Sequence, residues 1–180
     1  MNTHYFIGIK IPPTLGTDII EARDKTNLHE THKTLPFKED LHITLFYIGA
    51  MASEQIEHII QSLRNIDWSS FNLTTNGLAH FGSNRTPRVV YTDLEESDSL
   101  KRLQKEVVET LSDCIKTEHT KDFNAHITIA KKWASKGLLS IEDFHLPKST
   151  FEVSCFSVFK INPNSKPRYE EIASIRCKGG

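Results

Sequence analysis

The stretch LHITLFYIG, residues 41–49, alternates apolar and polar residues like a β-strand, and a second version of it, AHITIAK, occupies residues 125–131. The two histidines, His42 and His126, are 84 positions apart. Successive side chains of a strand point to opposite faces, so the apolar residue after each histidine can anchor one face in a core. His42 and Thr44, and likewise His126 and Thr128, then project together from the other face.

The elements around these two strands also follow the same order twice. The first copy is predicted as a strand at residues 5–11, a helix at 14–28, the first motif strand, a helix capped by Ser53 and a strand at 71–81. The second copy is predicted as a strand from Arg88, a helix capped by Ser97, the second motif strand, a short helix around 140–144, and strands at 150–161 and 169–177. We therefore predict an α+β fold of two related lobes about a pseudo-two-fold axis. The chain is predicted to be a single domain, 1–180, of two pseudo-repeats at about 3–83 and 87–178.

Composition favours an ordinary globular protein. The chain has 180 residues, of which 38% are hydrophobic and 25% charged, enough to bury one core. A formal net charge of −1 gives no overall positive field, so any phosphate must be held by a local cluster. The three cysteines are widely spaced, which favours a reducing cytoplasm over a disulfide framework. The start of the chain lacks a basic leader, and we expect no membrane segment.

The His-x-Thr pattern alone is weak, because the segment HETHKT at residues 29–34 contains it twice more. That segment is polar and has no strand period, so we predict a solvated helix end and loop there. The copies at His42 and His126 differ in having apolar partners and matching places in a repeat. Incidental polar faces on two edge strands are the alternative, but two imidazoles brought to one site suit a reaction that needs one acid and one base.

Other site types fit less well. Two histidines without a nearby carboxylate or thiolate make a poor zinc site, and Asp40 and Asp122 are expected to cap or solvate strand ends. The sequence has no G-x-S-x-G elbow, P-loop or dinucleotide fingerprint, so we predict neither a metal nor a cofactor. Metal-free phosphodiester hydrolysis fits better, since one neutral histidine can activate water while a protonated one donates a proton to the leaving oxygen. Thr44 and Thr128 can hold the non-bridging oxygens, and the residues alone leave open which histidine is the acid.

At this point the chain resembles a known family. LHITLFYIG and FNAHITIAK look like the two H-x-T-x motifs of the 2H phosphoesterase superfamily, specifically the bacterial RNA 2′,3′-cyclic phosphodiesterases once called 2′-5′ RNA ligases. The segments FIGIKIP, GLAHFGSNRTPRVVY and FSVFKINPNSKPRYEEI sit where that family has similar stretches. The resemblance implies a bilobal α+β fold, with two mainly antiparallel sheets and outer helices around a central groove. It also implies opening of a terminal 2′,3′-cyclic phosphate to a 2′-phosphate without metal or ATP.

The resemblance also implies roles for single residues. His42 would donate a proton to the leaving 3′-oxygen, His126 would accept one from water, and Thr44 and Thr128 would bind phosphate. Family members often carry arginine five residues after the second histidine, where this chain has Lys131, which we expect to bind phosphate without bidentate geometry. They also often have Arg-Pro ahead of the first motif, where this chain has Phe37-Lys38, and Lys38 is a candidate for the missing charge.

Three functions stay open from the sequence. The first is hydrolysis of RNA 2′,3′-cyclic phosphate ends by a cytoplasmic monomer that binds RNA ends or short oligonucleotides and no membrane. The second is hydrolysis of other cyclic phosphates or of 2′-5′ linked oligonucleotides. The third is binding of RNA ends without catalysis. Secondary candidates for gripping phosphate or stacking a base are Arg88, Lys132 and Trp133, whereas Tyr47, Phe123 and Tyr169 are predicted to be packing residues.

Overall fold

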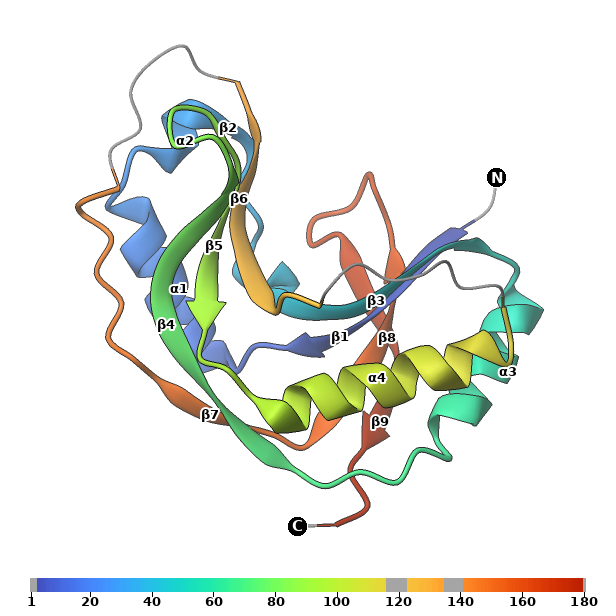
Figure 1. Cartoon of the computed structure of the whole chain (residues 1–180). Helices are drawn as coiled ribbons and strands as arrows, with labels where there is room; N and C mark the ends of the chain where they lie inside the picture. Colours follow the sequence, from blue (N-terminus) through green and yellow to red (C-terminus); the bar gives the residue numbers. More distant parts are fainter. Residues whose placement is uncertain (1–2, 116–122, 135–140, 180) are drawn as a thin grey trace.

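The computed structural model describes residues 3–115, 123–134 and 141–179. Within these residues, nine strands form one strongly curled sheet in which every pair of strands is antiparallel (Figure 1). The predicted α+β class is confirmed. The strands are β1 (Thr3–Lys10), β2 (His32–Thr34), β3 (His42–Met51), β4 (Phe71–Gly82), β5 (Pro87–Leu94), β6 (His126–Trp133), β7 (Thr150–Val153), β8 (Cys155–Ile161) and β9 (Tyr169–Arg176). The helices are α1 (Pro13–Asp24), α2 (Leu28–Thr31), the 3₁₀ helix η1 (Lys38–Asp40), α3 (Ser53–Leu63) and α4 (Asp98–Ser112).

The strand order is β7-β4-β5-β6-β3-β1-β8-β9, with β2 paired to β6. The two motif strands, β3 and β6, are therefore neighbours in the middle of the sheet. Each half of the sheet takes strands from both halves of the sequence, because β4 lies beside β5 and β8 lies beside β1. The two predicted sets of antiparallel strands thus exchange a strand with each other and join into one continuous sheet.

This exchange explains one error in the predicted elements. The single strand predicted at 150–161 is two strands, because the chain leaves β4 after Val153 and then forms β8, which pairs with β1 from Ser157 onward. The short helix predicted around 140–144 is also wrong where it can be seen. Residue 140 lies outside the described residues, and residues 141–144 form a turn closed by the Phe144 N–H to the Ile141 carbonyl at 3.0 Å. Ala52, rather than Ser53, precedes α3 as its N-cap residue.

The helices cover the core face of the sheet with amphipathic patterns. Ser97 caps α4 as predicted, since its hydroxyl accepts the Leu100 N–H at 3.1 Å. The apolar residues of α3 and α4 that recur at spacings of three and four are buried in the core: Ile56, Ile59, Ile60, Leu63, Leu100, Leu103, Val107 and Leu111. In the part of the chain that the structure describes, no helix is long and apolar enough to cross a membrane.

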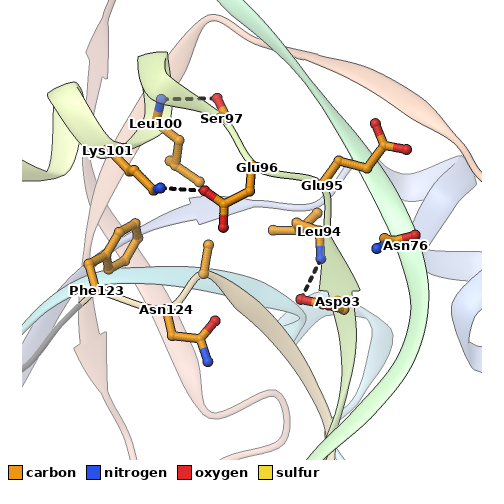
Figure 2. A pocket seen from close by; sticks show the side chains of 11 residues that line it. Asn76, Asp93, Leu94, Glu95, Glu96, Ser97, Leu100, Lys101, Phe123 and Asn124 are labelled. Carbon is orange, nitrogen blue, oxygen red and sulfur yellow. Dashed lines mark hydrogen bonds and ion pairs between the residues drawn. The ribbon is translucent and has the colours of Figure 1, made fainter.

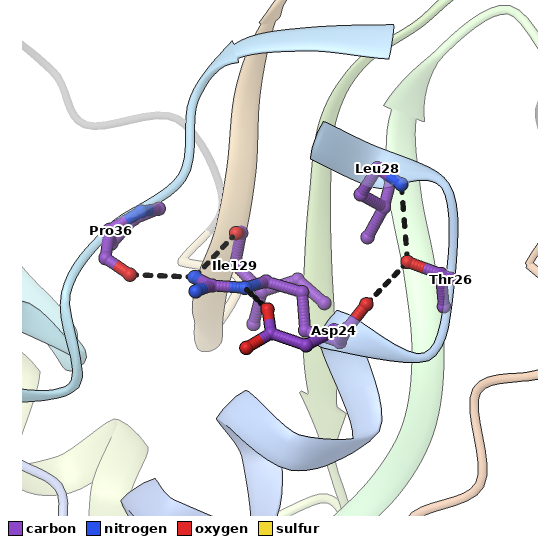
Figure 3. A network of polar contacts seen from close by, with 6 residues as sticks. Asp24, Thr26, Leu28, Pro36 and Ile129 are labelled. Carbon is purple, nitrogen blue, oxygen red and sulfur yellow. Dashed lines mark hydrogen bonds and ion pairs between the residues drawn. The ribbon is translucent and has the colours of Figure 1, made fainter. Parts of the chain in front are cut away.

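Two helix side chains donate to backbone carbonyls of the motif strands, and the two accepting carbonyls are 84 residues apart. The buried Arg23 guanidinium of α1 donates to the Ile129 carbonyl of β6 at 3.4 Å, and also to Pro36 O at 2.6 Å (Figure 3). The Gln104 amide of α4 donates to the Leu45 carbonyl of β3 at 3.3 Å. Leu45 and Ile129 are each three residues past the motif histidine. Each motif strand is therefore held by a helix from the opposite half of the sequence, as a pseudo-two-fold axis requires.

The contact between the two motif strands offers a test of this architecture. Ile43 and Ile127 are register partners, and both are fully buried at 0% exposure. We expect Ile127→Ala to lower the free energy of unfolding by about 3 kcal/mol, because it leaves a cavity where the halves of the sheet meet. Ile127→Val should cost about 1 kcal/mol. Urea unfolding followed by circular dichroism measures both changes, and a loss below about 1 kcal/mol in Ile127→Ala would contradict the placement.

Candidate active site

The sheet places both predicted His-Thr pairs on one face. Ile43 and Ile127 point into the core, so the half-buried His42 and Thr44 of β3 and the half-buried His126 of β6 point the other way. Thr128 of β6 is also half-buried and points to the same face as His126. Because β3 and β6 are antiparallel and in register at the isoleucines, each histidine lies across from the threonine of the other motif. The structure thus brings together all four residues that the motifs predicted.

Each imidazole is oriented by a hydrogen bond to the backbone carbonyl two residues before it. The Nδ1 atom of His42 is 2.7 Å from the Asp40 carbonyl oxygen, and that of His126 is 2.8 Å from the Asn124 carbonyl oxygen. A carbonyl oxygen only accepts, so each Nδ1 carries a hydrogen and donates it. In the neutral rings the lone pair is then on Nε2, which in His42 lies 2.9 Å from the Thr44 hydroxyl. Both histidines therefore present a nitrogen that can accept or, once protonated, donate a proton.

Aromatic rings pack around each histidine. The ring of His42 lies 4.6 Å from Phe6 and meets Tyr169 edge-on at 5.1 Å. His126 meets Phe81 edge-on at 5.0 Å and lies 5.1 Å from Tyr91. Tyr169, predicted only as a packing residue, does pack, but it does so against a motif histidine. Rings held on several sides keep few rotamers, which fixes where each Nε2 points.

Burial controls the charge of His42. Its pKa is lowered to about 4 from an ordinary value of 6.5, chiefly because burial disfavours the charged ring. The hydrogen bond to the Asp40 carbonyl opposes this shift, and the positive charges of Lys131 and His126 reinforce it. His42 is therefore neutral near pH 7 in the free protein.

The predicted phosphate ligand Lys131 lies within electrostatic reach of His42. The pKa of Lys131 is itself lowered by burial and by the charge of Arg168, while Asp40 raises it. Arg168 was not among the residues singled out from the sequence. Lys38, the proposed substitute for a family arginine, is exposed on η1, and its stem lies over Gly16 of α1. The second cation beside Lys131 is thus Arg168, which is distant in sequence and has no motif to reveal it.

Asp40 has a role that the sequence reasoning missed. The residue is only 3% exposed, and its carboxylate accepts the backbone N–H groups of Arg168 at 2.9 Å and Tyr169 at 3.1 Å. Its carbonyl oxygen meanwhile holds His42. Asp40 therefore caps the start of β9, one of the two roles expected for it, and also fastens that strand to the first motif. Asp40 lies two residues before His42, as Asn124 lies two residues before His126, and this matching position could have revealed its role from the sequence.

The structure gives no support to a metal site among these residues. Across residues 3–115, 123–134 and 141–179, no group of three or more histidine, cysteine, aspartate or glutamate side chains is placed to hold a metal ion. Asp122, considered with Asp40 as a ligand, lies outside the described residues.

The HETHKT segment is only partly the solvated helix end and loop that was predicted, because His29, Glu30 and Lys33 are exposed but the residues between them are not. Thr31 and His32 are buried, and His32 pairs with Trp133 as β2 adds to the edge of β6. The Nε2–H of His32 donates to the Pro87 carbonyl oxygen at 2.8 Å, and burial lowers the pKa of this ring. Trp133 meets His32 edge-on at 5.4 Å. These residues support β6 and have partners away from the motif histidines.

A pocket flanks each motif histidine. One, of about 320 Å³, adjoins Asn124 on the His126 side and is lined by Asp93, Glu95 and Glu96 (Figure 2). The other, of about 410 Å³, adjoins Asp40 on the His42 side. Asp40 and Asn124 are the residues whose carbonyls hold the two histidines, so each pocket is lined by a residue that positions one of them.

Comparison with known proteins agrees with this geometry. Residues 11–163 match the model of the 2′-5′ RNA ligase superfamily. The RNA 2′,3′-cyclic phosphodiesterase of Bacillus subtilis is 30% identical over 175 residues, which cover 94% of this chain and 93% of that protein. The protein of the same name from Thermotoga maritima is 28% identical over 181 residues, covering 97% and 96%.

Solved structures share the fold. The crystal structure of Escherichia coli LigT complexed with 3′-AMP aligns with a TM-score of 0.82 at 17% identity, over 99% of each chain. The crystal structure of TT0787 from Thermus thermophilus aligns with a TM-score of 0.77 at 20% identity, over 98% of each chain. At these identities the likeness concerns the fold.

The low pKa of His42 can be checked directly. We expect its ring to remain neutral, with the proton on Nδ1, at every pH above about 4, because burial disfavours the charged form. Long-range ¹H–¹⁵N spectra recorded between pH 3 and pH 8 report tautomer and charge, and His42→Gln assigns the signal. A His42 ring that titrates near its ordinary pKa of 6.5 would contradict the burial seen here.

The same shift predicts how stability depends on pH. Between pH 6.5 and pH 4 the unfolded chain takes up a proton on residue 42 that the folded protein does not, so acidification favours unfolding. We expect the wild-type protein to lose about 2 kcal/mol more of its unfolding free energy than His42→Gln between pH 7 and pH 5. Urea unfolding at the two pH values measures this difference. Equal losses in the two proteins would show that residue 42 has an ordinary pKa.

Proposed function

The chain belongs to the 2′-5′ RNA ligase superfamily, and we propose that it hydrolyses terminal 2′,3′-cyclic phosphates of RNA to 2′-phosphates through its two motif histidines. One observation carries this proposal. Two imidazoles share a face of the sheet, and equivalent backbone carbonyls fix both in the tautomer that presents Nε2. Relatives named RNA 2′,3′-cyclic phosphodiesterase, similar over most of the chain, support the substrate class.

In the proposed reaction, water attacks the phosphorus atom opposite the 3′-oxygen of the terminal ribose. His126 Nε2 takes a proton from the water as its oxygen bonds to phosphorus. The bond from phosphorus to the 3′-oxygen breaks, and His42 Nε2 gives its proton to that oxygen. The products are a 2′-phosphate and a 3′-hydroxyl, and a proton returns from His126 to His42 through solvent before the next turnover.

The charge of the substrate makes His42 able to donate. In the free protein its pKa is lowered to about 4, partly by the charge of Lys131. A phosphate anion placed beside His42 and Lys131 favours the protonated ring, so binding raises this pKa. Thr44, whose hydroxyl lies 2.9 Å from His42 Nε2, can turn that hydroxyl to a phosphate oxygen when the ring is protonated. Thr128 has the equivalent place on β6, and Lys131 supplies positive charge.

The proposal extends to the location and assembly of the protein. The three cysteines, Cys114, Cys155 and Cys177, all carry free thiols, which suits the reducing cytoplasm that the sequence predicted. We also propose that the protein acts as a monomer, because all the residues assigned to the reaction come from one chain.

The two-histidine mechanism predicts a sharp loss on mutation. His42→Ala and His126→Ala should each lower the rate on an oligonucleotide with a 2′,3′-cyclic phosphate end by about a thousandfold, because each removes a proton-transfer group. The assay is run in EDTA, which should leave the wild-type rate unchanged. ³¹P NMR identifies the product as a 2′-phosphate. His29→Ala is a matched control, since exposed His29 belongs to another His-x-Thr copy away from the motif strands.

The other outcomes of this assay separate the remaining alternatives. Wild-type rates in both motif variants would eliminate the mechanism. Turnover only of 2′-5′ linkages or of other cyclic phosphates would reassign the substrate. Binding of the cyclic end without turnover would make the protein an RNA-end binder, and a rate lost in EDTA would indicate a metal site.

A further inference from the structure

We propose that the pocket beside His42 binds the RNA chain on the 5′ side of the cyclic phosphate, holding the preceding phosphodiester and its base. This inference rests on the proposed function and names the part of the substrate that a mononucleotide lacks. The pocket has a volume of about 410 Å³ and lies between residues 33–37 and the turn at 163–168. We call it the cationic pocket.

Its positive charges form no ion pairs with the residues that the structure describes. Lys33, Lys166 and Arg168 line the cationic pocket. Among the residues that the structure describes, none of the three takes part in an ion pair. The Nε of Arg168 is buried and, within the same residues, has no hydrogen-bond acceptor. A buried donor without an acceptor is costly, and a phosphate oxygen is an acceptor that would satisfy it.

The cationic pocket also offers an aromatic surface. Phe37 is 44% exposed, although large apolar side chains are usually buried. Proteins that bind single-stranded RNA stack bases on exposed aromatic rings next to cations that hold phosphates. The neighbouring Pro36 is fixed, since its carbonyl oxygen accepts from the buried Arg23 at 2.6 Å (Figure 3). The rim that carries Phe37 is therefore attached to α1.

The cationic pocket is joined to the catalytic residues. Asp40 lines it, accepts the Arg168 backbone N–H at 2.9 Å, and holds His42 through its carbonyl oxygen. Arg168 also lies close enough to affect the charge of Lys131. A phosphodiester at Arg168 is thus next to a cyclic phosphate at Lys131 and His42, as expected for consecutive phosphates of one strand.

The pocket on the other side of the site has an acidic lining among the described residues. Asp93, Glu95 and Glu96 line it; Glu96 is paired with Lys101, which also lines it (Figure 2), and Glu95 is paired with Lys148. A polyanionic strand is therefore attracted more strongly to the His42 side than to the His126 side. The described linings of the two pockets differ in charge, so the protein distinguishes the two directions across a pseudo-symmetric site.

The side on which the RNA chain lies bears on which histidine is the proton donor. The leaving 3′-oxygen stays on the ribose, and the ribose stays attached to the RNA chain. With the chain in the cationic pocket, the leaving oxygen faces His42 and the in-line water faces His126. The charge of the pockets therefore favours His42 as proton donor, an assignment that the matching hydrogen bonds of the two rings leave open.

The test compares one nucleotide with two. The substrates are adenosine 2′,3′-cyclic phosphate and the dinucleotide ApA with a 2′,3′-cyclic phosphate end. We expect the wild-type kcat/KM to be at least about tenfold higher for the dinucleotide. Phe37→Ala should remove about tenfold from the dinucleotide value and change the mononucleotide value less than about twofold, and Arg168→Gln should lower the dinucleotide value about tenfold more than the mononucleotide value. Phe37→Tyr should keep the preference, and Arg102→Gln, the same charge change on α4, should alter neither value.

Equal kcat/KM values for the two substrates in the wild-type protein would overturn the inference, as would an equal loss on both in Arg168→Gln. Failure of the proposed function is recognised separately, by wild-type protein that hydrolyses neither substrate. In that case, calorimetry is used to measure the affinities for 3′-AMP and for ApA with a 3′-phosphate, which tests the cationic pocket without catalysis. Tighter binding of the dinucleotide that is lost in Arg168→Gln would support the cationic pocket, and equal affinities would refute it.

Discussion

The single register pair between Ile43 and Ile127 is the contact on which the active site depends. It joins the two halves of the sheet at β3 and β6, with both side chains fully buried. Because neighbouring residues on a strand face opposite ways, burying this pair turns the motif histidines and threonines to the other face. A slip of one residue in either strand would place an imidazole in the core, so the hydrophobic core and the catalytic geometry select the same register.

The repeat supplies two equivalent histidines, and the surroundings make them different. The Nδ1 bonds to Asp40 and Asn124 and the helix bonds to Ile129 and Leu45 obey the pseudo-two-fold axis. The charges do not, since Arg168 and its neighbouring lysines lie on one side and carboxylates on the other. A symmetric scaffold can bind a phosphate symmetrically. The proposed division into an acid and a base needs the asymmetry that these charges provide.

Features that depend on the local alternation of apolar and polar residues were predicted from the sequence. Features that depend on which strands pair with each other were missed. Alternation around Ile43 and Ile127 was enough to find both motif strands and the shared face of their histidines. The exchange of β4 and β8 between halves was not predictable, because strand period does not reveal a partner, and the break after Val153 followed from it. Arg168 was missed for the same reason, since the fold alone brings it to Lys131.

Linkage connects the low pKa of His42 to substrate recognition. If a bound phosphate raises the affinity of His42 for a proton, protonation of His42 must raise the affinity for phosphate by the same factor. Burial, reinforced by the charge of Lys131, keeps the free ring neutral, so an empty site does not add a third positive charge beside Lys131 and Arg168. The anion relieves that repulsion when it arrives. In the proposed mechanism the acid is therefore formed by the substrate it acts on, and neutral ligands of similar shape leave His42 unable to donate.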